Sequence, residues 1–252
     1  MSRATTRQAP SVGAPLLAFD RVSFDYEGRV ALDGASFEVR RGEAVALAGP
    51  NGCGKSTALR LAAGLAHPSR GTVTFDGDRI DAAALARQGF AKRFHQRVGL
   101  VFQDPDVQLF CPSVAEEVSF GPRQMGLPAD EASRRTDDAL RLFGLGDLAD
   151  RAPYQLSGGE RKKVALACVV SMAPELLLLD EPTAALDEDS EAEVAEFLRA
   201  YVAAGHSVLA TTHDRSLVSA LGAREVRLDK RHHVVLPPEP CPATRPAPPM
   251  RF

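Results

Sequence analysis

Apolar and polar positions alternate in two segments near the start of the chain, at residues 18–24 and 35–39. This alternation is typical of strands with one buried face, so both segments are predicted to be β-strands. Residues 44–48 and 176–179 are apolar throughout, which is typical of strands buried on both faces of a parallel sheet. Helix-like segments separate such runs from residue 16 to about residue 228. This order predicts an α/β domain.

The two ends of the chain differ from this middle section. Residues 1–15 are small and polar, and we expect a flexible tail there. Residues 231–252 contain seven prolines, too many for a packed helix or strand, so an extended or disordered tail is expected. The remaining residues, 16–230, are predicted to form the folded domain.

Composition narrows the class of protein. The 252 residues carry a formal net charge of −3, and they include no Trp and only three Tyr. Such a chain has no general basic field for nucleic acid and few rings for base stacking, so no nucleic-acid partner is predicted. The longest mostly apolar stretch, 164–173, is about half of a membrane span. Since the first twenty residues lack an apolar core of signal-peptide length, we expect a cytosolic protein.

A glycine-rich loop, GPNGCGKST, follows the buried strand at residues 44–48. It fits the G-x-x-x-x-G-K-[ST] pattern of loops that bind nucleoside triphosphates, and a helical segment follows it as that pattern requires. Glycines let consecutive backbone N–H groups point at phosphates where side chains would collide. Lys55 is expected to bind the β- and γ-phosphates and the Ser56 hydroxyl to ligate Mg²⁺. The predicted binding residues of the loop are Gly49, Pro50, Asn51, Gly52, Cys53, Gly54, Lys55, Ser56 and Thr57.

The four cysteines show no metal-type spacing, and reduced thiols are expected. Cys53 lies inside the glycine-rich loop, at a predicted helix start and near Lys55. Such surroundings lower the pKa of a thiol, so Cys53 is predicted to be the most reactive of the four and to be protected by MgATP.

A second motif, LSGGE, spans residues 156–160. Ser157 and Glu160 fit a capping box at the start of a helix, and the two glycines between them leave backbone N–H groups bare for phosphate. The basic run that follows, at residues 161–163, is interpreted as the polar face of this helix. An ordinary capped helix would also carry such a motif.

The buried strand at residues 176–179 ends in Asp180 and Glu181. An acidic pair at the carboxyl end of a strand lies where ligands bind in an open α/β sheet. Asp180 is therefore predicted to hold Mg²⁺, and Glu181 to orient or deprotonate an attacking water.

Together these motifs resemble the ATP-binding subunits of ABC transporters, over about residues 16–228. GPNGCGKST resembles the Walker A loop of that family. Asp180 and Glu181 resemble the end of Walker B with its catalytic glutamate, and LSGGE resembles the signature motif. Gln103, after the predicted strand 98–102, resembles the Q-loop glutamine, which contacts Mg²⁺ and water.

Three further positions follow in the family's order. His213 resembles the switch histidine that contacts the γ-phosphate, and residues 184–187 resemble the D-loop, which ends in Asp187. Tyr26 is placed like the aromatic residue that stacks on adenine. The resemblance implies that Glu181, His213 and Gln103 are catalytic and that Ser56, Gln103 and Asp180 hold the metal.

The resemblance also implies a fold and an assembly. The fold is a P-loop NTPase (RecA-like) sheet core with an inserted helical subdomain at about residues 104–170 and an N-terminal antiparallel β region. Two such subunits, identical or different, would dimerise head to tail, with ATP and Mg²⁺ as cofactors. Each would bind the nucleotide of its partner through the signature and D-loop residues Ser157, Gly158, Gly159, Glu160 and Asp187.

A finer resemblance lies in residues 98–127, which look like the ATPases of energy-coupling-factor importers. Residues 90–97 and 121–127 are most similar to the cobalt and nickel uptake ATPases. This implies a transmembrane coupling protein, a substrate-binding membrane subunit, and a peripheral position on the cytoplasmic face of the membrane. Ser113 and Glu116 predict a short capped helix. Residues 108–110 are then expected to be exposed for docking, although Leu109 and Phe110 could instead fill the helical subdomain.

Other interpretations remain at this point. The solute could be a vitamin rather than a metal ion. A soluble ABC ATPase acting on ribosomes or DNA would be expected to show two ATPase domains, coiled coils or a basic surface, and this sequence has none of these. A non-hydrolysing regulator fits poorly with the Glu181, His213 and Gln103 set. Two adjacent histidines, His232 and His233, are interpreted as a solvated strand edge rather than a metal site.

Overall fold

The alternating segments near the start of the chain pair with one another in the computed structural model, which describes residues 14–235. The strand β1 (Leu17–Tyr26) is antiparallel to both β2 (Arg29–Val39) and β4 (Arg70–Phe75). The short strand β5 (Asp78–Arg79) completes a four-stranded sheet in the order β2-β1-β4-β5. This is the antiparallel β region expected near the N-terminus.

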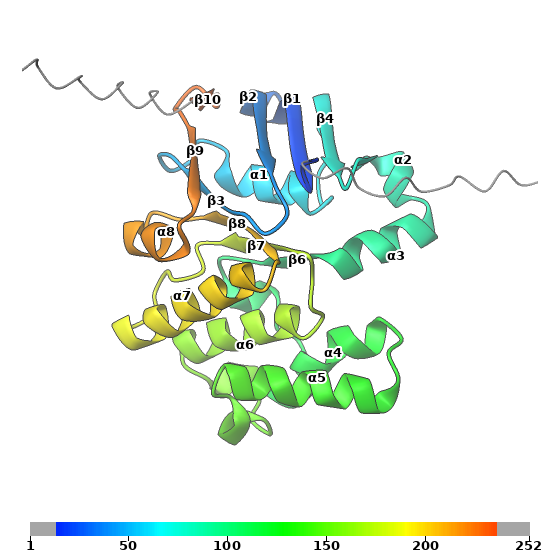
Figure 1. Ribbon diagram of the computed structural model, residues 1–252, viewed down its shortest axis with the longest axis vertical. Helices are drawn as coiled ribbons and strands as arrows, with labels where there is room; N and C mark the ends of the chain where they lie inside the picture. The colour runs from blue at the N-terminus through cyan, green and yellow to red at the C-terminus, as the bar shows by residue number, and fades with distance from the viewer. Residues whose placement is uncertain (1–13, 236–252) are drawn as a thin grey trace, which may run out of the picture.

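The fully apolar segments form a second sheet, in the order β10-β9-β3-β8-β7-β6 (Figure 1). Its strands are parallel except for β10, which is antiparallel to β9. Because the parallel strands share one direction, the loops at their carboxyl ends meet at one edge of the sheet. The bounds are β3 (Ala44–Ala48), β6 (Val98–Val101), β7 (Leu176–Asp180), β8 (Ser207–Thr211), β9 (Arg224–Leu228) and β10 (Val234–Val235).

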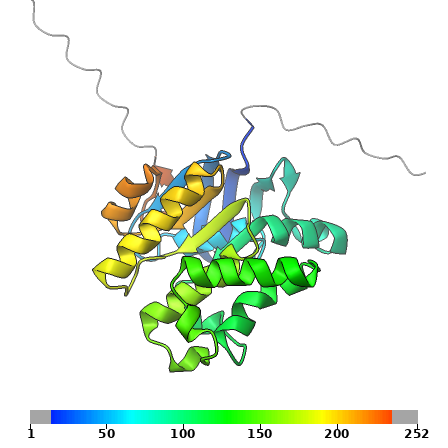
Figure 2. The same cartoon turned by 60° about the horizontal axis from the view of Figure 1, so that its bottom comes forward.

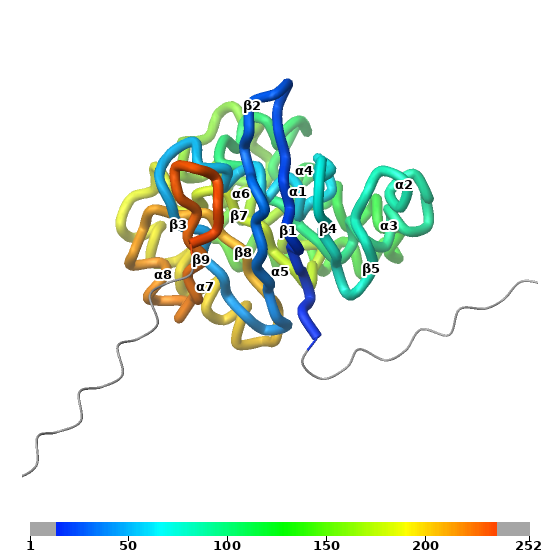
Figure 3. The backbone as a smooth tube through the Cα atoms, turned by 90° about the horizontal axis from the view of Figure 1, so that it is seen from above, coloured from blue at the N-terminus to red at the C-terminus, as the bar shows by residue number. Residues whose placement is uncertain are grey.

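The strand β10 falls in the proline-rich segment 231–252, where we expected no packed element. Residues 231–235 instead complete a hairpin with β9, which lies beside β2 when seen from above (Figure 3). The N–H of Asp33 donates to the carbonyl of His232 at 3.1 Å and joins this hairpin to β2. The rest of the predicted tail and residues 1–13 lie outside the described residues.

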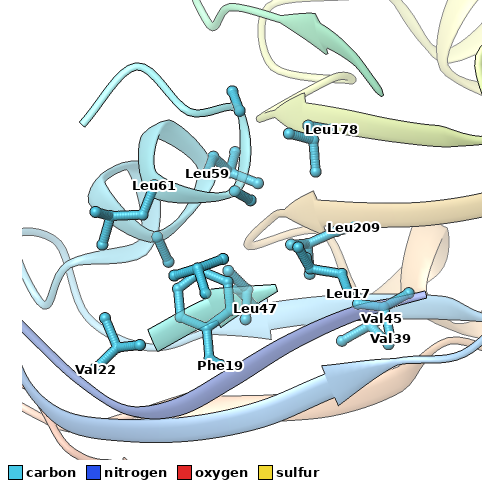
Figure 4. Packing of buried hydrophobic residues seen from close by; sticks show 14 of the residues in the cluster. Leu17, Phe19, Val22, Val39, Val45, Leu47, Leu59, Leu61, Leu178 and Leu209 are labelled. Carbon is cyan, nitrogen blue, oxygen red and sulfur yellow. The ribbon is translucent and has the colours of Figure 1, made fainter. Parts of the chain in front are cut away.

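The leucines of β7 divide between two apolar cores. Leu176 and Leu178 face the core between the two sheets, while Leu177 and Leu179 face the helices on the other side. The helix α1 (Lys55–Ala62) packs in the first core, where its Leu59 approaches side chains of both sheets (Figure 4). All four leucines of β7 are fully buried, as a strand covered on both faces requires.

Within residues 14–235, seven further α-helices surround the sheets. The helices α4, α5 and α6 pack on one another as a lobe that comes forward in Figure 2. Ser113 caps α4 by accepting a hydrogen bond from the N–H of Glu116, as predicted. No helix within residues 14–235 is long and apolar enough to span a bilayer. The bounds are α2 (Ala82–Leu85), α3 (Gln88–Arg97), α4 (Val114–Gln124), α5 (Ala129–Leu142), α6 (Gly158–Val170), α7 (Glu188–Ala203) and α8 (Arg215–Leu221).

A charge cluster ties the two sheets together away from the carboxyl edge. Arg97 lies 2.6 Å from Glu175 and 2.7 Å from Asp76, and Arg41 pairs with the same two carboxylates. Hydrogen bonds from Arg97 hold the pKa of Glu175 below its ordinary value. Burial raises the pKa of Asp76, but its bonds to the two arginines bring it below the ordinary value.

Candidate nucleotide-binding site

The glycine-rich loop joins β3 to α1, and at two of its positions a side chain would collide with the neighbouring backbone. Gly49 has φ 145°, and a Cβ there would lie 2.3 Å from the carbonyl oxygen of Leu228. Gly54 has φ 107°, and its Cβ would lie 2.1 Å from the carbonyl oxygen of Ala31. Gly54 also precedes α1 without any side-chain cap, so the first N–H groups of that helix are left to bind an anion.

Lys55 is largely buried and reaches back across the loop. Its Nζ donates to the carbonyls of Gly49 at 2.9 Å and Pro50 at 3.2 Å, and lies 3.3 Å from Nε2 of His213. The same Nε2 lies 3.0 Å from Oδ1 of Asn51. The structure thus places the predicted phosphate-binding lysine in contact with the residue predicted to sense the γ-phosphate.

Side-chain oxygen atoms of Ser56, Asp180 and Thr211 lie close together where β7 and β8 end beside the glycine-rich loop. The hydroxyl of Ser56 donates to Oδ1 of Asp180 at 3.2 Å, and the hydroxyl of Thr211 donates to the same atom at 2.6 Å. Gln103 lines the same cavity from the end of β6. A carboxylate, a hydroxyl and an amide oxygen are the hard ligands that suit Mg²⁺, so the predicted metal-binding residues fit this ion.

Glu181 has a backbone conformation that is rare for a residue with a side chain, with φ 48°. Its N–H donates to both the carbonyl and the hydroxyl of Thr211 at 3.1 Å. Its carboxylate accepts a hydrogen bond from the N–H of His213 at 3.3 Å, and Oε1 lies 3.5 Å from Nε2 of that residue. The bonds to Thr211 hold the strained turn and direct the carboxylate towards the cavity.

One cavity of about 1190 Å³ connects these groups. Tyr26 is at its rim, where the phenol oxygen accepts a hydrogen bond from Arg60 at 3.2 Å. A ring in that position can cover one face of a base. The predicted residues that line the cavity are Tyr26, Asn51, Gly52, Gly54, Lys55, Ser56, Thr57, Gln103, Asp180, Glu181 and His213.

Seven other residues line the cavity without having been predicted: Arg29, Val30, Ala31, Thr183, Glu191, Asp214 and His232. Ala184, which also lines it, belongs to the predicted D-loop. Thr183 and Asp214 could have been inferred, because each closely follows a motif residue. His232 had no such signal. His233 is exposed and lies 3.1 Å from Asp33, as expected for a solvated edge, whereas His232 is half-buried and lines the cavity. No cluster of three metal-ligating residues occurs within residues 14–235.

Gly49, Pro50 and Cys53 belong to the loop but do not line the cavity. The thiol of Cys53 is only 2% exposed and packs in the core between the sheets. Burial raises the pKa of this thiol and outweighs the nearby charge of Lys55. The low pKa predicted for Cys53 is therefore wrong, and burial removes the basis on which its high reactivity was predicted.

The capping box of the second motif is confirmed. The hydroxyl of Ser157 accepts from the N–H of Glu160 at 3.2 Å, and Glu160 accepts from the N–H of Ser157 at 2.7 Å. That backbone bond lowers the pKa of Glu160. Asp187 likewise caps α7. Neither the signature residues 157–160 nor Asp187 of the D-loop lines the cavity of its own chain.

The basic run after the motif does not form a single polar face. Lys163 binds Glu193 on α7 at 2.6 Å, but Lys162 is 2% exposed and points into the protein. Its ammonium is enclosed by main-chain carbonyls of other elements. The sequence interpretation of Lys162 as a solvated residue is therefore wrong.

A separate groove of about 390 Å³ lies between α3, α4 and α6. Phe110 is 69% exposed at its edge, in edge contact with Phe120. Gln108, in contrast, is turned inwards to bond the N–H of Phe102 and the carbonyl of Ala165. Leu109 packs partly against the second core. Of residues 108–110, only the phenylalanine is thus exposed as expected.

Comparison with known proteins identifies the class. The family model described as ABC transporter matches residues 32–184. The nickel import ATP-binding protein LarO of Lactiplantibacillus plantarum is 44% identical over 213 residues, which are 84% of this chain and 88% of LarO. The resemblance drawn from the motifs is therefore confirmed.

Two solved structures confirm the fold. CbiO1 of Clostridium perfringens, described as part of the CbiONQ ABC transporter complex, has a TM-score of 0.76 and 38% identity, covering 88% of this chain and 87% of its own. The ATP-binding cassette MJ0796, solved as a dimer with ADP and phosphate, has a TM-score of 0.78 and 27% identity, covering 86% and 96%. The predicted P-loop NTPase fold is the one observed.

Proposed function

Because the chain belongs to the ATP-binding subunits of ABC transporters, we propose that it drives the import of nickel or cobalt ions through a membrane complex of energy-coupling-factor type. The observation that carries this proposal is the cavity that joins the glycine-rich loop, the acidic end of β7 and His213. The names of the relatives support the class of solute. A vitamin importer and a non-transport ATPase are the alternatives.

ATP is bound by the backbone of the glycine-rich loop, with its phosphates against the start of α1 and Lys55. Ser56, Asp180 and Gln103 would hold Mg²⁺, which neutralises charge on the β- and γ-phosphates. Glu181 orients and deprotonates the attacking water, and His213 keeps the carboxylate in place through its N–H. Tyr26 covers the adenine.

The signature helix supports a head-to-tail dimer. The start of α6 carries a satisfied capping box and two glycines, yet it lies outside its own cavity. In the dimer, Ser157 and the N–H groups beside it would bind the γ-phosphate held by the partner subunit. The solved dimer of MJ0796 with ADP and phosphate supports dimerisation. ATP then favours the closed dimer, and loss of the products lets it open.

The groove beside Phe110 is the proposed docking site for the transmembrane coupling protein. Apolar side chains, among them Phe110 and Phe120, line it together with six polar or charged ones. Glu117 fixes its edge by accepting hydrogen bonds from the N–H groups of Phe110 at 2.7 Å and Cys111 at 2.5 Å. An apolar helix segment fits such a surface. The protein would then sit peripherally at the cytoplasmic face of the membrane.

The test is purification of the tagged protein from detergent-solubilised membranes of its native host. Recovery of a helical coupling protein together with a small membrane subunit is expected, followed by ATP-dependent uptake of radiolabelled nickel or cobalt in vesicles containing the complex.

Phe110→Glu should release the membrane partner while Leu142→Glu, an exposed position on α5, should not. ATP-dependent uptake of a vitamin but of neither metal would replace the proposed solute. Recovery with ribosomes or DNA would overturn the transport function.

A further inference from the structure

Lys162 lies in the second turn of α6, two residues after the signature motif, and is only 2% exposed. A buried ammonium is costly unless its three N–H bonds find acceptors. Its Nζ donates to the carbonyls of Gln103 at 2.8 Å and Phe102 at 3.1 Å, and lies 3.5 Å from the carbonyl of Asp180. One side chain thus bonds the segment that carries the Q-loop glutamine and approaches the strand that carries the acidic pair.

Phe102 and Gln103, which Lys162 binds, lie beyond Val101, the last residue of β6 that pairs with β7. Two further contacts join the same segment to α6. Arg161 lies 2.9 Å from Asp106, and Gln108 donates to the carbonyl of Ala165 at 3.0 Å. Residues 102–108 are therefore attached to the signature helix by three side chains.

We propose that Lys162 is a positioning residue that fixes the backbone of Gln103 to the signature helix, so that any displacement of α6 moves Gln103 directly. When a nucleotide draws the signature motif towards a partner subunit, Gln103 moves with the helix rather than with β6. The side chain of Gln103 then reaches its catalytic position only when α6 is in place. This inference rests on the ATPase function and is independent of the transported solute.

The ammonium of Lys162 also lies in the field of three carboxylates. Desolvation lowers the pKa of Lys162 to about 8, while the charges of Asp180, Glu181 and Asp104 act in the opposite direction. Lys163, the next residue, makes none of these contacts and binds Glu193 instead. It provides a matched control of the same residue type on the same helix.

The experiment compares the full-length parent with Lys162→Met, Lys162→Arg and the control Lys163→Met. Phosphate release gives kcat and KM, a fluorescent ATP analogue gives the nucleotide Kd, and hydrogen exchange reports on amides 102–108. For K162M we expect kcat to fall about 10- to 100-fold, as for a catalytic group misplaced by an ångström, with Kd within about threefold of the parent. Amides 102–108 should exchange faster in K162M alone, and K162R should recover most of the lost kcat.

Two results would overturn the proposal. One is a K162M protein with the parent kcat. The other is a parallel loss of kcat, nucleotide affinity and thermal stability that K162R does not relieve, because that describes a purely structural residue. If K162M is insoluble, Lys162→Gln keeps an amide donor on a shorter side chain and should give an intermediate kcat. A parent protein that hydrolyses no ATP would contradict the ATPase function itself, which separates the two failures.

Discussion

The hydroxyl of Ser56 donates a hydrogen bond to Oδ1 of Asp180 at 3.2 Å, although 124 residues separate the two in the chain. One lies at the start of α1 and the other at the end of β7. Their contact places a hydroxyl and a carboxylate beside the phosphate-binding loop. This contact is the basis for the first prediction.

Asp180→Asn should remove most of the ATPase activity, because a neutral amide binds Mg²⁺ more weakly than the negatively charged carboxylate that it replaces. We expect a fall in kcat of about 100-fold or more, as for loss of one electrostatic contact to the transition state. Nucleotide affinity should also lose its dependence on Mg²⁺. Titrating a fluorescent ATP analogue with and without Mg²⁺ checks this, and an unchanged Mg²⁺ dependence would remove Asp180 from the metal site.

Glu181→Gln should separate binding from hydrolysis. The amide keeps the size of the side chain but cannot deprotonate water, so kcat should fall about 10²- to 10⁴-fold while ATP still binds. An ATP-bound dimer should then accumulate on a sizing column. Glu193→Gln, outside the cavity, is the control and should hydrolyse ATP like the parent. Parent-like turnover in the Glu181 variant would refute its catalytic role.

Gly54→Ala and Gly52→Ala test the shape of the phosphate loop. Both glycines have positive φ, 107° and 78°, so each substitution introduces backbone strain. Only at Gly54 would the new Cβ meet a backbone atom, the carbonyl oxygen of Ala31 at 2.1 Å. We therefore expect Gly54→Ala to weaken ATP binding far more than Gly52→Ala in the same titration. Equal effects would mean that strain alone governs the loop.

Cys53 should be slow to react with maleimide in the native protein, because its thiol is buried and its pKa is raised. Cys111 is partly exposed, and burial and Glu117 raise its pKa as well, so exposure rather than acidity should favour it. Peptide mass mapping at short labelling times should find Cys111 modified before Cys53, with Cys53 modified after denaturation. Rapid native labelling of Cys53 that MgATP suppresses would instead restore the reactive thiol predicted from the sequence.

Arg97→Met should lower the free energy of unfolding by about 1–3 kcal/mol at pH 7, since it removes charged hydrogen bonds to Glu175 and Asp76. The pKa of each carboxyl is lowered by folding, so this stability is present above the unfolded pKa values, near 4, and is lost as the pH falls below them. Urea unfolding at pH 7 and pH 3 should show a smaller difference at the lower pH. Arg93→Met, an exposed neighbour on α3, should show little difference at either pH.

The main site could be predicted because its residues follow a geometric rule. Asp180 ends β7, Gln103 follows β6, and the phosphate loop follows β3. Because these strands are parallel, the topology brings all three to the carboxyl edge of the sheet. The nucleotide loop also has a spacing that few other structures require. These features depend on local sequence and on the order of the strands.

Lys162 and Cys53 were misjudged because their surroundings come from distant parts of the chain. A lysine in a basic run is normally solvated, but the carbonyls of Phe102 and Gln103, about sixty residues earlier, accept hydrogen bonds from the buried ammonium of Lys162. Cys53 occupies a loop position that suggests exposure, yet its side chain packs in the core between the sheets. His232 enters the cavity through a hairpin within a segment whose prolines predicted no packed element.

The division of the β7 leucines between two cores affects how the protein unfolds. Leu177 and Leu179 support the helices, while Leu176 and Leu178 on the same strand support α1 and the antiparallel sheet. Because β7 contributes side chains to both cores, opening one core displaces leucines that pack in the other. The helical lobe and the sheets are therefore expected to melt in a single cooperative transition, so that even mild destabilisation of the lobe is resisted by the whole nucleotide-binding fold.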